Sequence, residues 1–229
     1  MQYLCDEAAK IGITLSEKQL ADFLKYYEAV VEYNKSVNLT AITEKIEFTE
    51  KHFLDSLAGA EFLPQGAKFI DIGSGAGFPA IPLKLVRPDL KMTLLDSLNK
   101  RVAFLRQATA LLKLTDITAL HVRAEDAAHT TLRESFNVCA ARAVAALPVL
   151  LEYASPFVKP GGIFIAYKTD EVELTAAENA AAELKMQLLT VKKYSLPAGN
   201  VRALFVFEKT APLPAKYPRP QAQIKKHPL

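Results

Sequence analysis

The chain has 229 residues, of which 50% are hydrophobic and 23% are charged, so it can bury a full core and a disordered chain is not expected. Its first residues lack the basic and then apolar pattern of a signal peptide, and no run of about 18 apolar residues could cross a bilayer. The two cysteines, Cys5 and Cys139, form no Cys-x-x-Cys pair. We expect reduced thiols in the cytoplasm, one of them buried.

The formal net charge of +3 is located in the tail. Residues 210–229 contain Lys216, Arg219, Lys225 and Lys226 and no acid, which leaves 24 basic against 25 acidic side chains in the rest of the chain. A basic segment with five prolines cannot build a core of its own and is expected to be mobile. Two interpretations are open, an arm for a polyanion such as nucleic acid or a solvated terminus.

The first sixty residues show a helical pattern. Apolar residues recur at three- and four-residue spacing over 15–33, which predicts an amphipathic helix. Ser16 and Gln19 form a capping-box pattern at its start. A second helix is predicted at about 46–60. Because no strand pattern precedes about residue 67, residues 1–64 are predicted to form an N-terminal helical extension.

From about residue 68, strand and helix patterns alternate in a core assigned to residues 65–210, which the tail at 211–229 follows. The predicted strands are 68–72, 92–96, 117–122, 136–144, 161–168, 188–196 and 202–209. The predicted helices are 98–113, 147–157 and 170–185. Strands separated by helices predict a parallel sheet that is covered on both faces. The short connection between the last two strands predicts an antiparallel pair.

A glycine-rich turn, DIGSGAGF, follows the first predicted strand and carries Gly73, Gly75 and Gly77. Glycine permits positive φ and lets a ligand lie against bare backbone, and this edge of a doubly wound sheet is where ligands bind. Dinucleotide enzymes favour G-x-G-x-x-G, whereas Phe78 occupies the place of the third glycine here. The Lys and Ser/Thr of a nucleoside-triphosphate P-loop are absent. The turn therefore predicts a different ligand.

An acid, Asp71, lies two residues before the first glycine. A carboxylate at the mouth of the turn suits the cationic sulfonium of S-adenosylmethionine and does not suit a pyrophosphate. We therefore predict S-adenosylmethionine as the cofactor and Asp71 as one of the residues that bind it. A tight turn without a ligand is the alternative interpretation.

Two further strand ends carry candidate cofactor residues. Asp96 ends the second strand, 19 residues beyond Gly77, where an acid can accept hydrogen bonds from both ribose hydroxyls. This feature fits NAD and S-adenosylmethionine alike, and taken alone Asp96 could also be a helix N-cap. Arg123, Ala124 and Glu125 follow the third strand. The loop there is expected to face the adenine edge, and a charged surface turn is the alternative.

The segment DIGSGAGFPAIPLKLVRPDLKMTLLDSLNKRVAFLRQ resembles the glycine loop through second helix of the RsmG (GidB) family. Members of that family are bacterial methyltransferases that modify N7 of a guanine in 16S ribosomal RNA. Further matching segments are YNKSVNLTAIT, KHFLDSL, RAED, ARAVA and KYPR, so the resemblance covers about 13–220, and the tail is similar to the Gram-positive branch. Ala76 and Ala80 replace a Pro and a Gly of some relatives, and both are small enough to keep the loop.

The resemblance implies a class I methyltransferase fold, an α/β Rossmann-like fold with a seven-stranded sheet whose last strand is antiparallel. The residues that it places around S-adenosylmethionine are Gly73, Gly75, Gly77, Phe78, Asp96, Ala124 and Glu125. Arg142 is similar to the family arginine beside cofactor and substrate. The polar positions that match the RNA-facing mouth are Asn38, His52, Arg123, Lys168 and Arg202. The expected partner is 16S rRNA, the small ribosomal subunit or its assembly intermediate, and the expected state is a monomer.

The chemistry of guanine N7 agrees with what the sequence lacks. N7 carries a free lone pair and loses no proton, so methyl transfer needs positioning and no general base. The Asp/Asn-Pro-Pro-aromatic run of amino-group methyltransferases is absent after the fourth strand. Cys139 lies in an apolar strand and is interpreted as a buried thiol. The four histidines show no metal-ligand spacing, so no metal site is predicted.

Arg142 is hypothesised to contact the cofactor carboxylate, guanine O6 or a phosphate, because a bond to N7 would block the reacting lone pair. Without the resemblance, a surface salt bridge would explain this arginine equally well. Two other functions are open. An NAD-dependent oxidoreductase would need a pyrophosphate turn and a hydride-transfer site, and neither is visible. The other is a non-catalytic RNA-binding module with a vestigial nucleotide pocket.

Overall fold

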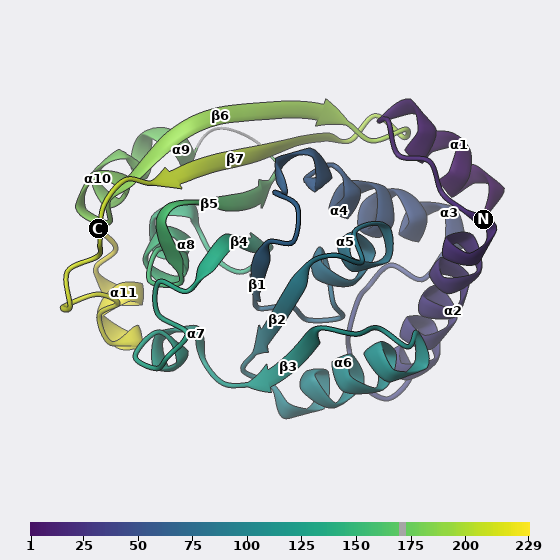
Figure 1. Ribbon diagram of the computed structural model, residues 1–229, viewed down its shortest axis with the longest axis horizontal. Helices are drawn as coiled ribbons and strands as arrows, with labels where there is room; N and C mark the ends of the chain where they lie inside the picture. Colours follow the sequence, from purple (N-terminus) through teal and green to yellow (C-terminus); the bar gives the residue numbers. More distant parts are fainter. Residues whose placement is uncertain (170–172) are drawn as a thin grey trace.

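The computed structural model describes residues 1–169 and 173–229. In this part of the chain, a seven-stranded sheet has the order β3-β2-β1-β4-β5-β7-β6 (Figure 1). Strands β1 to β5 pair in parallel, and β7 is antiparallel to both of its neighbours, which confirms the predicted sheet. The strands are Lys68–Ile72 (β1), Lys91–Asp96 (β2), Ile117–His121 (β3), Phe136–Arg142 (β4), Val158–Lys168 (β5), Met186–Ser195 (β6) and Val201–Lys209 (β7).

Helices cover both faces of the sheet (Figure 1). The longer ones are Gln2–Lys10 (α1), Glu17–Asn34 (α2), Ala80–Val86 (α5), Asn99–Leu111 (α6) and Leu147–Ala154 (α8). The shorter ones are Lys45–Phe48 (α3), Asp55–Leu57 (α4), Ala124–Ala127 (α7), Glu173–Ala176 (α9), Glu178–Glu183 (α10) and Gln221–Lys226 (α11), with a π-helical turn at Thr49–Leu54 and a 3₁₀ turn at Ala60–Phe62. The capping box of Ser16 and Gln19 is present at the start of α2.

Two predicted helices differ from the observed ones. The helix predicted at about 46–60 is divided into α3, the π-helical turn and α4. The helix predicted at 170–185 is divided into α9 and α10, and its first three residues lie outside the described residues. No helix among the described residues is long and apolar enough to span a membrane.

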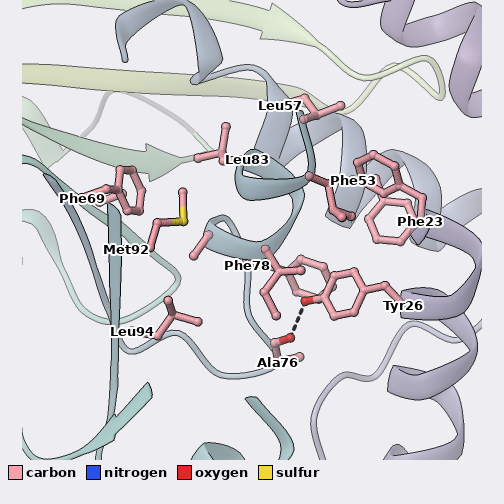
Figure 2. Close-up of a cluster of buried hydrophobic side chains, with 14 of the residues drawn as sticks. Phe23, Tyr26, Phe53, Leu57, Phe69, Ala76, Phe78, Leu83, Met92 and Leu94 are labelled. Carbon is pink, nitrogen blue, oxygen red and sulfur yellow. Dashed lines mark hydrogen bonds between the residues drawn. The ribbon is translucent and has the colours of Figure 1, made fainter. Parts of the chain in front are cut away.

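The helical segment, residues 1–64, shares a core with one face of the sheet. Phe23 and Tyr26 of α2, Phe53 of the π-helical turn and Phe78 of the glycine loop form one aromatic cluster (Figure 2). The Tyr26 hydroxyl donates a hydrogen bond to the carbonyl of Ala76 inside the glycine loop (Figure 2). The helical segment therefore packs against the glycine loop and supports it. The domain boundaries at 64 and 210 stay a prediction.

The C-terminal tail is packed against α8 and the loop before β4, at the end of the molecule opposite the N-terminal helices (Figure 1). Tyr217 and Ile224 are buried. The Arg219 guanidinium binds the buried Glu152 of α8, with Nε 2.8 Å from Oε1 and 3.1 Å from Oε2, and Nη2 2.6 Å from Oε2. Arg133 donates to three tail carbonyls. The expectation of a mobile tail was wrong, because the groups that hold it lie in distant parts of the sequence.

Candidate functional site

Two cavities open at the carboxyl ends of the parallel strands, and Gly73 lines both of them. The large cavity, of about 560 Å³, lies between the glycine loop, the helical segment and the ends of β5 and β7. The small cavity, of about 310 Å³, lies between the loops that follow β1, β2, β3 and β4. Since the β1–β4 neighbours are where the sheet reverses its strand order, this is the expected ligand position in an open α/β sheet.

The three loop glycines have different tasks, although all have positive φ. A Cβ on Gly77 would lie 2.6 Å from both the Tyr26 hydroxyl and Ile81, and a Cβ on Gly73 would lie 2.8 Å from Val144. Gly75 is different, because the nearest atom to a Cβ there would be 3.9 Å away. Gly73 and Gly77 therefore permit close packing of the loop, whereas Gly75 keeps open space on the side of the large cavity.

Asp96 ends β2, lines the small cavity and is almost completely buried. Its Oδ2 accepts a hydrogen bond from the amide of Gly75 at 2.9 Å, and its Oδ1 accepts one from the amide of Leu98 at 2.8 Å. The N-cap of α6 is Leu98, so Asp96 is not the capping residue. The carboxylate thus holds the glycine loop in place and still presents lone pairs to the small cavity.

The loop after β3 contributes Arg123, Ala124 and Glu125, and all three line the small cavity with Asp96. Glu125 is buried, and within residues 1–169 and 173–229 its Oε1 has no hydrogen-bond partner. Arg123 was expected at the RNA-facing mouth, but the structure brings it to the small cavity instead, because the backbone turns into α7 directly after it.

Asp71 lies beneath the glycine loop and lines neither cavity. It is completely buried inside β1, where it pairs with Leu94 and Ala140 of the flanking strands. Burial raises the pKa of its carboxyl group to about 7. The expectation of a carboxylate at the mouth of the loop is therefore not met, since both neighbouring strands enclose this position.

Arg142, at the end of β4, is held inside the large cavity rather than on the surface. Its Nη1 donates to Asp55 Oδ2 at 2.9 Å and to the carbonyl of Lys51 at 2.8 Å. The guanidinium lies 5.0 Å from the centre of the Phe78 ring, a cation–π distance. These contacts reach back 87 to 91 positions along the chain. They join the central sheet to the helical segment at the rim of the glycine loop.

His52 is stacked on Phe78, with ring centres 4.5 Å apart and an interplanar angle of 11°. Burial, with the nearby Arg142 cation, lowers the pKa of His52 to about 3, so the imidazole is neutral. Arginine can only donate, so His52 Nδ1 accepts from Arg142 Nη2 at 3.1 Å. The proton is therefore on Nε2, which donates to Thr40 Oγ1 at 2.8 Å. Both ring nitrogens are engaged.

Asp55 is the buried centre of the charges in the large cavity. Besides Arg142, it accepts a hydrogen bond from the Tyr194 hydroxyl at 2.7 Å, and Arg202 Nε lies 3.6 Å from its Oδ1. Sequence reasoning did not single out this residue. The available signal was its place three residues after His52 in KHFLDSL, and both residues line the large cavity.

Of the remaining residues predicted at the RNA-facing mouth, two line the large cavity and one does not. Lys168 lines the large cavity, where its ammonium binds Glu173 and the carbonyl of Ala145. Arg202 lines the same cavity. Asn38 is exposed and lines neither cavity, whereas its neighbour Leu39 lines the large one. The structure therefore does not support the prediction of Asn38 as a mouth residue.

A family model described as GidB, rRNA small subunit methyltransferase G, matches residues 19–203. The chain belongs to this family. Relatives named ribosomal RNA small subunit methyltransferase G include that of Pediococcus pentosaceus, 45% identical with 95% of this chain and 93% of the relative covered, and that of Lactococcus lactis subsp. lactis, 44% identical with 96% and 95% covered. The resemblance inferred from the motifs is confirmed over nearly the whole chain.

Several solved structures are similar in fold to this member of the GidB family. M. jannaschii TYW2 in complex with AdoMet is similar with a TM-score of 0.55, 16% identity and coverage of 68% of this chain and 75% of that chain. The ribosomal protein L11 methylase of Lactobacillus delbrueckii subsp. bulgaricus gives a TM-score of 0.54, 19% identity and coverage of 69% and 77%. The fold is that of class I methyltransferases, as predicted.

The site offers binding groups rather than a metal or a free base. Among the described side chains, no group of three or more His, Cys, Asp and Glu residues is placed to hold a metal ion. Cys139 is a free and buried thiol, and burial raises its pKa well above the usual range. The arrangement can hold an adenosine-bearing ligand along the glycine loop and an anionic, aromatic substrate among the cations of the large cavity.

Proposed function

We propose that the protein transfers a methyl group from S-adenosylmethionine to N7 of a guanine in 16S rRNA, within the small ribosomal subunit or an assembly intermediate. The observation that carries this proposal is the position of Gly73, which lines both cavities. The bare backbone at Gly73 separates the small cavity, which is suited to adenosine, from the large cavity, which is suited to the guanine of the substrate. A cofactor that lies along this backbone is accessible to a substrate from the other side.

The residues of the small cavity fit the cofactor. Asp96 provides acceptors for ribose hydroxyls, and the unpartnered Oε1 of Glu125 provides an acceptor for a ligand donor. Gly75, on the side of the large cavity, leaves the space in which the sulfonium end would lie against the loop. When bound, S-adenosylmethionine supplies an electrophilic methyl group that the N7 lone pair accepts without the loss of a proton.

The residues of the large cavity fit that reaction because none of those described above is a free base. His52 has a pKa of about 3 and both nitrogens engaged, and Asp55 is bound to Arg142 and Tyr194. Their role is to hold Arg142. Three of its five N–H groups serve these contacts, which leaves donors for guanine O6 or an RNA phosphate. Lys168 and Arg202 add positive charge for the RNA.

The test uses small subunits from a strain that lacks this protein. Wild-type protein with labelled S-adenosylmethionine should methylate one guanine, and cleavage chemistry that detects 7-methylguanine should map it. Gly75→Asp should bind no S-adenosylhomocysteine and transfer no label, because its carboxylate would fill the open space beside the loop. Label on an exocyclic amino group or a ribose would contradict the proposal.

Two further arms address the alternatives. The rate of methyl transfer should be compared between naked 16S rRNA, whole subunits and assembly intermediates, and the fastest of these identifies the substrate. We also propose that the protein is a cytoplasmic monomer. Binding calorimetry with NADH in place of S-adenosylhomocysteine should give no heat. Heat with NADH alone would support an oxidoreductase, and cofactor binding without any transfer would support a non-catalytic RNA-binding module.

A further inference from the structure

We propose that the C-terminal helix α11 is the outer wall of the adenosine site and takes part directly in binding the cofactor. This inference rests on the proposed function, because it assumes that the small cavity receives adenosine. The starting observation is that Gln221 and Lys225 line the small cavity together with Glu125 and Tyr153. A segment more than 120 residues beyond Asp96 in the sequence thus closes the cavity that Asp96 lines.

The wall is anchored firmly enough to shape a binding site. Ile224, between the two wall residues, is completely buried. Just before the helix, the backbone amide and guanidinium of Arg219 both bind Glu152, and Glu152 is itself almost completely buried in α8. The next residue of α8 is Tyr153, which faces the small cavity. The anchor in α8 is therefore next to a residue that lines the cavity, and α11 packs beside this helix (Figure 1).

Two polar atoms beside the wall point to a ligand. In the described part of the chain, Oε1 of Glu125 is buried and has no hydrogen-bond partner, and the buried hydroxyl of Tyr153 lies beside Gln221 of the wall; both side chains line the small cavity. Buried polar groups are almost always satisfied. An adenosine has amino and hydroxyl donors for the carboxylate and ring-nitrogen acceptors for the hydroxyl. Gln221 adds one amide that can both donate and accept.

The basic side chains of the tail therefore have unequal tasks. Arg219 is bound to Glu152, and Lys225 lines the small cavity. The adenosine half of the cofactor carries no phosphate, so the contribution of Lys225 is the apolar stem that covers the cavity. Lys226 has the same charge, is exposed, and does not line the cavity. The chain thus provides a matched pair of adjacent lysines.

The experiment measures binding, without catalysis, by titration calorimetry with S-adenosylhomocysteine and with methylthioadenosine, which lacks the amino-acid end. Gln221→Ala should weaken both ligands by the same factor, about three- to tenfold, as expected for one lost hydrogen bond. Lys225→Gln should weaken both by a smaller factor. Gln223→Ala and Lys226→Gln are the controls and should leave both affinities unchanged, with thermal unfolding confirming that all four variants are folded.

A second measurement tests the reciprocal effect, since a ligand that contacts the wall must also stabilise it. S-adenosylhomocysteine should slow tryptic cleavage after Lys225 and Lys226 in the wild type, and less so in Gln221→Ala. Wild-type protein that binds no S-adenosylhomocysteine would contradict the proposed function. Wild-type binding with unchanged affinity in Gln221→Ala and Lys225→Gln, and unchanged tail cleavage, would overturn the inference about α11 alone.

Discussion

The small and the large cavity meet at Gly73 but are built in opposite ways. The small cavity keeps a buried polar atom, Oε1 of Glu125, without a hydrogen-bond partner within the described residues. In the large cavity the central charges are already paired, and Asp55 alone contacts Arg142, Arg202 and Tyr194. A cavity with unpartnered polar atoms is suited to a small ligand that can form hydrogen bonds with those atoms. A cavity with paired charges is rigid before the substrate arrives, which suits a reaction that needs positioning and no base.

The substitution with the largest expected effect is Arg142→Lys, which tests whether the large cavity acts in methyl transfer separately from cofactor binding. Lysine keeps the charge but cannot form the fork that binds Asp55, the Lys51 carbonyl and His52 together. We expect methyl transfer to fall by about 100-fold, or about 2.7 kcal/mol of transition-state stabilisation. Affinity for S-adenosylhomocysteine should change less than about threefold, because Arg142 lines the large cavity and not the small one. Single-turnover kinetics and calorimetry measure the two effects.

A similar loss in both assays for Arg142→Lys would show that the two cavities do not divide the work. The control is Lys159→Gln, a change to an exposed charge that lines neither cavity. It should leave single-turnover methyl transfer and cofactor affinity as in the wild type.

Asp96→Ala is the corresponding change in the small cavity. It removes the acceptor for the ribose and the acceptor that binds the amide of Gly75, so cofactor affinity should fall by about ten- to a hundredfold, on the order of 1–3 kcal/mol. Methyl transfer at saturating cofactor should recover much of its rate. Calorimetry and transfer assays over a range of cofactor concentrations test both statements. Equal affinity in the mutant would mean that adenosine binds elsewhere.

The strand beneath the glycine loop and the large cavity respond to pH in opposite directions. The pKa of Asp71, below the glycine loop, is raised from 3.8 to about 7 by burial, so its contribution to stability is present below about pH 4 and is lost as the pH rises to about 7. The pKa of His52 is lowered from 6.5 to about 3, so its contribution is present above about pH 6.5 and is lost as the pH falls. Between these limits the two contributions oppose each other.

Single substitutions should separate these contributions. In urea unfolding, the free energy of unfolding of Asp71→Asn should rise with pH between about 4 and 6.5 more steeply than that of the wild type, by about 1.4 kcal/mol per pH unit. That of His52→Gln should fall with pH over the same range, relative to wild type, by a similar slope. Curves parallel to the wild type would show that neither group titrates as its surroundings require.

The smallest expected effect concerns the exposed charges of the tail. If Lys216 and Lys226 contact RNA phosphates, changing both to Gln should reduce the slope of log affinity against log salt by about 0.7–0.9 for each contact. Filter binding to 16S rRNA at several salt concentrations measures this slope. An unchanged slope would leave α11 with its role in the small cavity and no role in RNA binding.

Much of the glycine loop and the small cavity could be predicted from the sequence, because the patterns that indicate them are local. Gly73, Gly75 and Gly77 report the backbone conformation of one turn, and the acid at the end of β2 follows a recognisable strand. The same reasoning placed Asp71 at the mouth and was not supported there, because a strand enclosed by two neighbours buries its side chains. It also missed Asp55, whose importance depends on partners 87 and 139 positions away.

By itself, the sequence determined the parallel sheet with its antiparallel end, the glycine turn, the family and the capping of α2. The family follows from the resemblance of whole motifs, and the other features follow from the period of apolar residues and from backbone preferences, which act between neighbours in the chain. Tertiary structure alone decided that the basic tail is anchored rather than mobile, that Arg142 is bound to Asp55, and that α11 closes the small cavity. Such contacts join residues tens of positions apart, and they form only when the packed sheet brings their elements together.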